Sequence, residues 1–281
     1  MLLNPNLFAS TLVAAASLLA AEPIVATEPV LVDYFQLEEH RIAGRAHFRS
    51  ADAPRGISGT VFLDILVDDE GAVAAIAPNP DSTPGEIRRW YARAQALARQ
   101  WRFRPFLRDG LPVPARARAQ VEVLPPERWA RSRRSFPDVP PQEMSITLMR
   151  GGCFGPCPVY SVTIHGDGNV VFEGLAHTAV LGRRETNIGP ERVARLAARF
   201  RAANFWSLRD RYRANETDSA EYRLIVRAGS RTKAVVDYVG IQVGMPEVVT
   251  ALEDAVDEAA GTARWIAGEA LRQTPTTPVT R

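Results

Sequence analysis

The sequence has little of what most enzyme active sites are built from. Only two of its 281 residues are cysteine, and 33 of its 34 basic residues are arginine. It contains no Gly-x-Ser-x-Gly nucleophile elbow, no glycine-rich phosphate loop, no His-Glu-x-x-His zinc motif and no dinucleotide-binding glycine motif. Catalysis therefore has no specific support. We expect a binding protein that is not an enzyme, with no catalytic residue, no cofactor and no metal.

Charged residues are absent from the first 21 positions. The stretch from Leu7 to Ala21 is almost wholly apolar, which suits a signal-peptide core and is short for a membrane span of roughly 20 residues. Ala20 and Ala21 form a cleavage region, although no basic residue precedes the core and leucine stands where a second small residue is usual. We predict that residues 1–21 are a signal peptide, that the protein is exported to the periplasm, and that it has no permanent transmembrane helix.

Charge is unevenly spread, although the net charge is only +2. Residues 1–87 hold 4 basic and 12 acidic side chains, and residues 88–134 hold 13 and 3. The basic block is either an anion-binding face or an arginine-rich helix and strand in contact with solvent. In the second case the acidic side chains of residues 1–87 partly offset its charge. Nucleic acid is not an expected partner, because export argues against it and the block lacks the spaced aromatic residues of a stacking platform. An anionic envelope polymer fits the same charges better.

The chain length and a hydrophobic content of 46% predict two domains. Residues 22–58 are irregular apart from a β-rich run over residues 30–37, which predicts an added strand. Strands are then predicted over residues 60–67 and 72–76, followed by a helix from a capping box at Thr83 to about Trp101. Strict alternation of apolar and polar residues over 113–123 predicts a strand with one buried face. This first domain therefore follows a ββαβ order.

A linker rich in proline and arginine is predicted over residues 124–143, before a second domain over residues 144–265. The second domain shows several strands and two helices, the helices beginning near Pro190 and Pro246. Residues 266–281 are predicted to be a disordered tail. The expected fold class is α+β, in which each small domain has a mainly antiparallel sheet packed with one or two helices.

Four short motifs in residues 59–123 point to a known family. They are Gly59-x-Val61, Asp69-Glu-Gly71-x-Val73, Trp101-Arg-Phe103-x-Pro105 and Gly110-x-Pro112-Val113. With these motifs, residues 59–123 resemble the C-terminal domain of the TonB energy-transducer family. The resemblance implies a periplasmic domain that binds a short extended peptide by strand addition. The chain lacks the inner-membrane helix and long spacer of an energy transducer, so we expect the module without the energy-coupling function.

The strand after Gly110 is the expected docking edge, because unpaired backbone groups of an edge strand can pair with a guest. The arginines of this strand would favour an acidic guest peptide. Alternatively, the same charges would prevent another strand from pairing with the edge. The expected partner is an envelope protein or an extended peptide, with a link to TonB-type transport. The predicted docking residues are Val113, Ala115, Arg116, Ala117, Arg118, Ala119, Gln120 and Val121.

The pattern Cys153-x-Gly155-x-Cys157-Pro-x-Tyr160 is the most distinctive constellation in the chain. With Gly166-Asp-Gly168, Thr217-Asp218 and Asp237-Tyr-x-Gly240, it makes residues 146–260 resemble an uncharacterised bacterial domain family, which implies a fold but no activity.

The two cysteines have three possible roles. A structural disulfide is the first interpretation, because the count is even, the spacing is short and the leader indicates export. Thiol–disulfide exchange is an alternative, although redox motifs usually place two residues between the cysteines. A metal site would need two more ligands, and no His–His or Cys–His pair is near. His165 and His177 could share a sheet, but surface histidines are the simpler interpretation.

Overall fold

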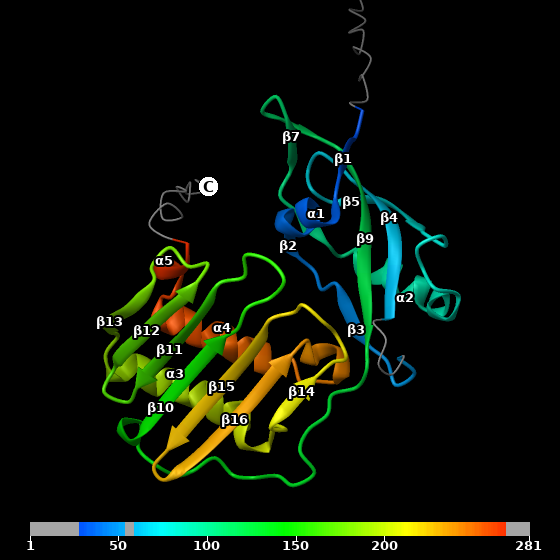
Figure 1. The fold of residues 1–281 in the computed structure, drawn as a ribbon. Coiled ribbons are helices and arrows are strands. Elements are labelled where there is room, and N and C mark those ends of the chain that lie inside the picture. Colours follow the sequence, from blue (N-terminus) through cyan, green and yellow to red (C-terminus); the bar gives the residue numbers. More distant parts are fainter. Residues whose placement is uncertain (1–27, 54–58, 268–281) are drawn as a thin grey trace, which may run out of the picture.

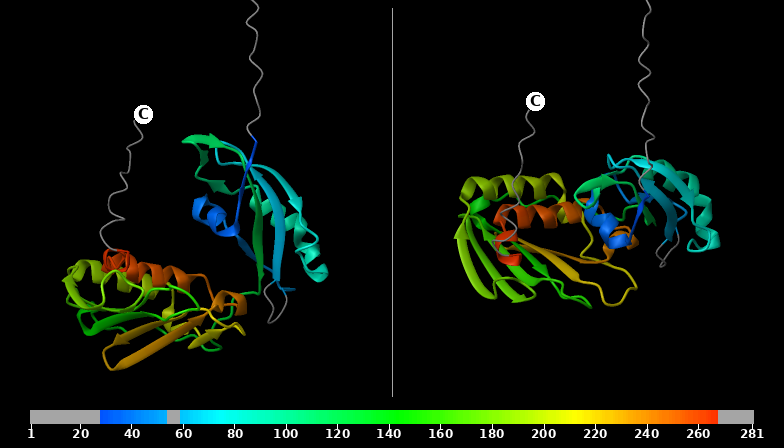
Figure 2. Two further views of the ribbon diagram at one scale, coloured as in Figure 1. Left: turned by 45° about the horizontal axis from the view of Figure 1, so that its top comes forward. Right: turned by 90° about the horizontal axis from the view of Figure 1, so that it is seen from above.

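A computed structural model describes residues 28–53 and 59–267 of the chain. The predicted signal peptide and residues 268–281 lie outside this part. Figures 1 and 2 show two α+β domains, each built on its own sheet and each with its own buried core, as the sequence predicted. Within the described residues, no helix is long and apolar enough to cross a membrane.

The first domain is built on a sheet in the order β1-β9-β4-β5. β4 (Gly59–Val67) pairs antiparallel with β5 (Val73–Pro78) and with β9 (Ala115–Leu124). Alternate residues of β4 and β9 are buried because successive side chains of a strand point to opposite faces. The predicted ββαβ order is therefore confirmed for this part of the domain.

The predicted helix of the first domain starts differently from its expected capping box. A 3-10 turn, η1 (Gly85–Trp90), precedes the helix α2 (Tyr91–Ala98). Thr83 does not cap it, because its hydroxyl accepts a hydrogen bond from the backbone N–H of Phe62 in β4 at 2.9 Å. The threonine thus ties the start of the helical segment to the sheet.

Trp101 and Phe103 anchor the return from the helix to the sheet. Both side chains are buried, and their rings meet edge to face with centroids 6.3 Å apart. Gly71 lies so close that a Cβ there would stand 2.0 Å from the carbonyl oxygen of Phe103, which requires glycine. The chain continues through β6 (Arg102–Phe103) and the hairpin of β7 (Phe106–Arg108) and β8 (Leu111–Val113).

Residues 28–53 are more regular than the sequence predicted. The expected strand is confined to β1 (Val30–Val32), after which the chain forms the helix α1 (Tyr34–His40). A capping box begins α1, because Asp33 accepts from the N–H of Gln36 and the Gln36 side chain accepts from the N–H of Asp33. The short strands β2 (Arg41–Ala43) and β3 (His47–Arg49) follow.

The second domain has a seven-stranded sheet in the order β13-β12-β11-β10-β15-β16-β14. All neighbouring strands are antiparallel except β14 and β16, which are parallel. The strands are β10 (Met144–Arg150), β11 (Val159–His165), β12 (Asn169–Ala176), β13 (Gly182–Asn187), β14 (Arg211–Arg213), β15 (Glu221–Ala228) and β16 (Arg231–Tyr238).

Two helices cover one face of this sheet, α3 (Pro190–Ala202) and α4 (Val248–Ala260), and they contact each other (Figure 2). Their apolar stripes meet the buried side chains of the strands, as helical spacing predicted. The short helix α5 (Ala263–Ile266) follows α4, and three 3-10 turns complete the domain, η2 (Pro141–Glu143), η3 (Phe205–Ser207) and η4 (Gly240–Val243).

One acidic residue of the second domain, Glu247, contacts three basic side chains of the first domain. Glu247 lies 3.1 Å from both Arg45 and His47, and Arg49 lies 3.8 Å away. Burial acts to raise the pKa of Glu247, but the hydrogen bond from His47 and the arginine charges outweigh it and lower the pKa. Arg49 also donates to the carbonyl oxygen of Met245 at 2.6 Å. These contacts join β3 to the segment that precedes α4.

Candidate functional site

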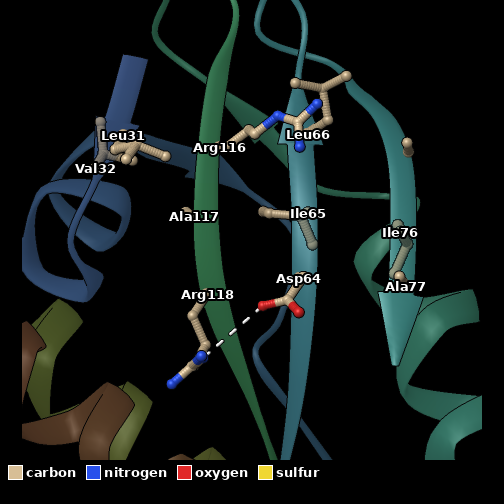
Figure 3. A pocket seen from close by; sticks show the side chains of 11 residues that line it. Leu31, Val32, Asp64, Ile65, Leu66, Ile76, Ala77, Arg116, Ala117 and Arg118 are labelled. Carbon is tan, nitrogen blue, oxygen red and sulfur yellow. Dashed lines mark ion pairs between the residues drawn. The ribbon is translucent and has the colours of Figure 1, made fainter. Parts of the chain in front are cut away.

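The open face of the first sheet carries a groove of about 540 Å³ (Figure 3). It runs across β1, β9, β4 and β5, on the side opposite the buried residues of β4 and β9. Its main side chains are Leu31, Asp64, Leu66, Ala77, Arg116 and Arg118. The alternation of β9 explains why both arginines reach this face while Ala117 between them is buried.

The two arginines of the groove differ in their partners. Arg118 lies 3.8 Å from Asp64, and both side chains are more than half exposed, so the pair adds little to stability. Arg116 has no ion pair within residues 28–53 and 59–267, and Figure 3 shows its side chain extending over the sheet toward Leu66. Leu31 is 84% exposed beside them. The groove therefore offers cationic groups next to exposed apolar surface.

The predicted docking strand is not a free edge, which corrects the prediction made from its sequence. β1 pairs in parallel with residues 115–117 of β9, and β3 pairs in parallel with residues 122–124. The backbone N–H of Val30 also donates to Pro114 O at 2.9 Å. Only residues 118–121 have no described strand beside them on that side, and α1 packs against β9 there (Figure 1).

The predicted docking residues divide into two groups. Those that point into the core are Val113, Ala115, Ala117, Ala119 and Val121. Arg116, Arg118 and Gln120 point to the other face. An added strand was predicted over residues 30–37, but its pairing with β9 and the strand β3 were missed, because strands of three residues show no periodicity. The pair Asp33 and Gln36 was a readable signal of a helix start, and it would have divided residues 30–37 into a strand and a helix.

In the second domain, Cys153 and Cys157 form the expected disulfide, with their Cα atoms 5.7 Å apart. The loop that they close holds Phe154, whose side chain is 88% exposed, and the N–H of Phe154 donates to the carbonyl oxygen of Asp218 at 2.8 Å. The motif residues Thr217 and Asp218 therefore lie beside the cysteine loop, where they help to fix its backbone.

Asp257 of α4 forms hydrogen bonds with three polar side chains of the second domain. Its carboxylate accepts hydrogen bonds from Tyr160 at 2.8 Å, from Arg150 at 2.9 Å and from Thr262 at 2.7 Å. Burial and the negative charge of Asp257 raise the pKa of Tyr160, which keeps the phenol protonated as a donor. The motif tyrosine thus joins the sheet to the end of α4.

Two further carboxyl groups are buried between α4 and the sheet. Asp237 accepts from the N–H of Gly240 at 2.7 Å, and burial raises its pKa. Glu253 is 1% exposed, and its Oε1 atom has no hydrogen-bond partner among the described residues. Burial, followed by the charge of Asp237, raises the pKa of Glu253 to about 8. Glu253 is therefore protonated in the folded protein at neutral pH.

The histidines considered as metal ligands are not brought together. His165 ends β11, whereas His177 follows Ala176, which pairs with the first residue of β11. The two histidines are thus separated by roughly 20 Å, the length of a strand of that size. Within the described ranges no group of three or more His, Cys, Asp or Glu residues is arranged to hold a metal ion.

The comparison with protein families finds a match in the second domain. A family model described as a domain of unknown function (DUF6438) matches residues 144–260, from the first residue of β10 to the last residue of α4. The match agrees with the family resemblance of the cysteine motif and names no activity. None of the curated proteins compared with the chain matches it.

Proposed function

We propose that this protein is a non-enzymatic binding protein of the cell envelope, whose first domain binds an extended peptide of an envelope partner. The observation that supports it most is the arrangement around β9. There, Arg116 and Arg118 border a groove, and the adjacent edge is paired with a strand of only three residues. The TonB-like motifs of residues 59–123 support the same mode of binding, and the apolar leader supports a periplasmic location.

In this proposal the guest strand takes the place of β1. Val30 and Val32 are partly buried and pack against the core of the first domain, whereas Leu31 is 84% exposed, so β1 buries less apolar surface than a central strand of the sheet. Each of its few backbone hydrogen bonds contributes about 0.5–1.5 kcal/mol, and a guest strand of similar chemistry would restore both these bonds and the valine contacts. A partner of moderate affinity could offset the cost of displacing β1.

The chain itself indicates the chemistry of the guest. The segment that contains β1 reads Glu28-Pro-Val-Leu-Val-Asp33, in which carboxylates flank a short run of branched apolar residues. A guest of this kind would place apolar side chains over the groove and carboxylates near its two arginines. Charge complementarity would then select acidic peptides against basic ones.

A synthetic peptide tests the proposal directly. We expect a labelled Glu-Pro-Val-Leu-Val-Asp peptide to bind a variant that lacks residues 28–32 and keeps the helix cap Asp33, and to bind the intact chain at least about tenfold more weakly, because β1 competes. A peptide of the same composition in scrambled order is the control. Far-ultraviolet circular dichroism establishes that the shortened variant folds. Equal binding of the two peptides, or no binding to a folded shortened variant, would count against strand replacement.

The groove arginines provide a second readout that leaves β1 in place. Arg116→Glu should abolish any preference of the protein for acidic over basic guest peptides. Arg183→Glu, on the exposed strand β13 of the other domain, is the matched control and should leave the preference unchanged. If both variants behave alike, the open face of the first sheet does not select the guest.

A further inference from the structure

A second cationic site lies where the linker crosses the edge of the second sheet. Two adjoining hollows of about 420 and 230 Å³ share Arg134, Trp206, Asp210 and Lys233 in their walls. We refer to both together as the linker pocket. Its charged residues are Arg131, Arg134, Arg209, Asp210, Arg231 and Lys233. The pocket thus joins the arginine run of the linker to η3 and β16.

The linker is held in place at this pocket. The N–H of Ala130 donates to Ser207 O at 3.0 Å, and the N–H of Arg134 donates to the Ser207 hydroxyl at 2.9 Å. Phe136 then packs edge to face on Trp206, with ring centroids 4.9 Å apart. Because backbone hydrogen bonds are formed on both sides of Arg131, the segment that carries Arg131 and Arg134 is held at the pocket before any ligand arrives.

The charge of the pocket is unbalanced. Lys233, the only lysine of the chain, is buried, and its ammonium group bonds to Asp210 and to the carbonyl oxygen of Leu208 at 2.7 Å. Asp210 is the single acid in the wall, against four exposed arginines and the lysine. None of these four arginines forms an ion pair with a described residue. The pocket therefore has the charge to hold a multivalent anion.

The arginines on the outer side of α3 show the contrast. Arg192, Arg195 and Arg199 also border a hollow, but Glu258 shares it and lies 3.5 Å from Arg199. Those three arginines come from a single helix and one of them is paired with Glu258, whereas the cations of the linker pocket come from three separate segments. Convergence from separate segments favours recognition of a compact group over general surface charge.

We propose that the linker pocket binds a phosphate group, carried either by an anionic lipid headgroup or by a soluble phosphate compound. A phosphate suits the site because its several oxygens and its charge of up to two can engage more than one arginine fork, which a single carboxylate does less well. The site lies in the second domain and is independent of the peptide-binding groove. It would give the protein an anchor on a phosphate-rich surface while the first domain binds its partner.

The test uses the intact chain and two probes. Binding to inorganic pyrophosphate is measured by calorimetry, and binding to vesicles of phosphatidylglycerol and phosphatidylcholine in equal parts by sedimentation. We expect the variant Arg134→Gln/Arg231→Gln to bind at least about tenfold more weakly, since the loss of one charge-assisted hydrogen bond has an effect of that size. Arg192→Gln/Arg195→Gln is the matched control and should change binding less than about twofold.

The probes distinguish the source of the phosphate. Binding to charged vesicles that pyrophosphate competes away supports a lipid headgroup, and binding to pyrophosphate alone supports a soluble compound. All substituted arginines are exposed, so unchanged circular dichroism is expected for both variants. The proposal is overturned if the wild-type chain binds neither probe, or if the two variants lose binding equally.

Discussion

Replacing Glu253 by glutamine should change how the stability of the second domain depends on pH. Glu253 is buried, its Oε1 atom has no partner in the described part of the chain, and its pKa is raised from 4.5 to about 8. Between these two values the folded protein keeps a proton that the unfolded chain releases. The stabilisation that this proton gives the folded protein is therefore fully present below pH 4.5, and it is lost as the pH rises from 4.5 through 8.

The size of the effect follows from the pKa. At about 1.4 kcal/mol for each pH unit, the rise from 4.5 to about 8 corresponds to roughly 5 kcal/mol between acidic and alkaline conditions. Glutamine has nearly the same shape as the protonated acid and cannot ionise. We therefore expect Glu253→Gln to match the wild type near pH 5 and to exceed it by several kcal/mol at pH 9.

Urea unfolding at a series of pH values, followed by tryptophan fluorescence with the disulfide intact, measures this difference. Glu258→Gln is the control, because Glu258 lies on the same helix with its side chain 79% exposed. It should shift the curve by no more than about 0.5 kcal/mol at any pH. If the free energies of unfolding of wild type and Glu253→Gln change in parallel from pH 5 to pH 9, the conclusion that Glu253 is protonated in the folded protein is refuted.

Three further substitutions test the packing around the same helix and in the first domain, each by urea unfolding. Gly240→Ala should lose about 1–3 kcal/mol, because a Cβ would stand 2.7 Å from Tyr212 Cβ and 2.8 Å from Asp237 Oδ1, and unchanged stability would show that the turn can relax. Asp257→Asn should lose about 2 kcal/mol through its weakened bonds to Arg150, and an unaffected variant would remove Asp257 as the link between helix and sheet. Trp101→Ala should lose about 3–5 kcal/mol, because its indole is buried, and a smaller loss would mean that the helix is held to the sheet elsewhere.

Much of the fold follows from periodicity and turn residues that can be read along the chain. β9 was predictable because residues 115–123 alternate without interruption, although the predicted strand began too early, at Val113, which ends β8. The helix α3 was predictable because its apolar side chains recur at helical spacing. The Asp69-Glu70-Gly71 turn between β4 and β5 was equally plain. These features depend on residues close together in sequence, so a local pattern is sufficient to find them.

The candidate sites depend on pairings between distant segments, which no local pattern reveals. That β9 is covered could not be read from its own sequence, because its neighbour β1 lies more than eighty residues earlier. The linker pocket likewise needs residues 131–134 to meet β16. The burial of Glu253 was predictable from the sequence, because Glu253 lies four residues after Val249 and therefore on the buried stripe of α4.

The central claim is that the edge and open face around β9 receive an extended envelope peptide. The most direct measurement places a photoreactive amino acid at position 66, whose leucine lines the same groove, irradiates intact cells, and sequences the crosslinked segment by mass spectrometry. The same probe at position 183 is the control. We predict an extended, acidic segment of one envelope protein crosslinked at 66 and not at 183. Crosslinks that are identical at the two positions, or none at 66 in cells that hold the folded protein, would contradict the claim.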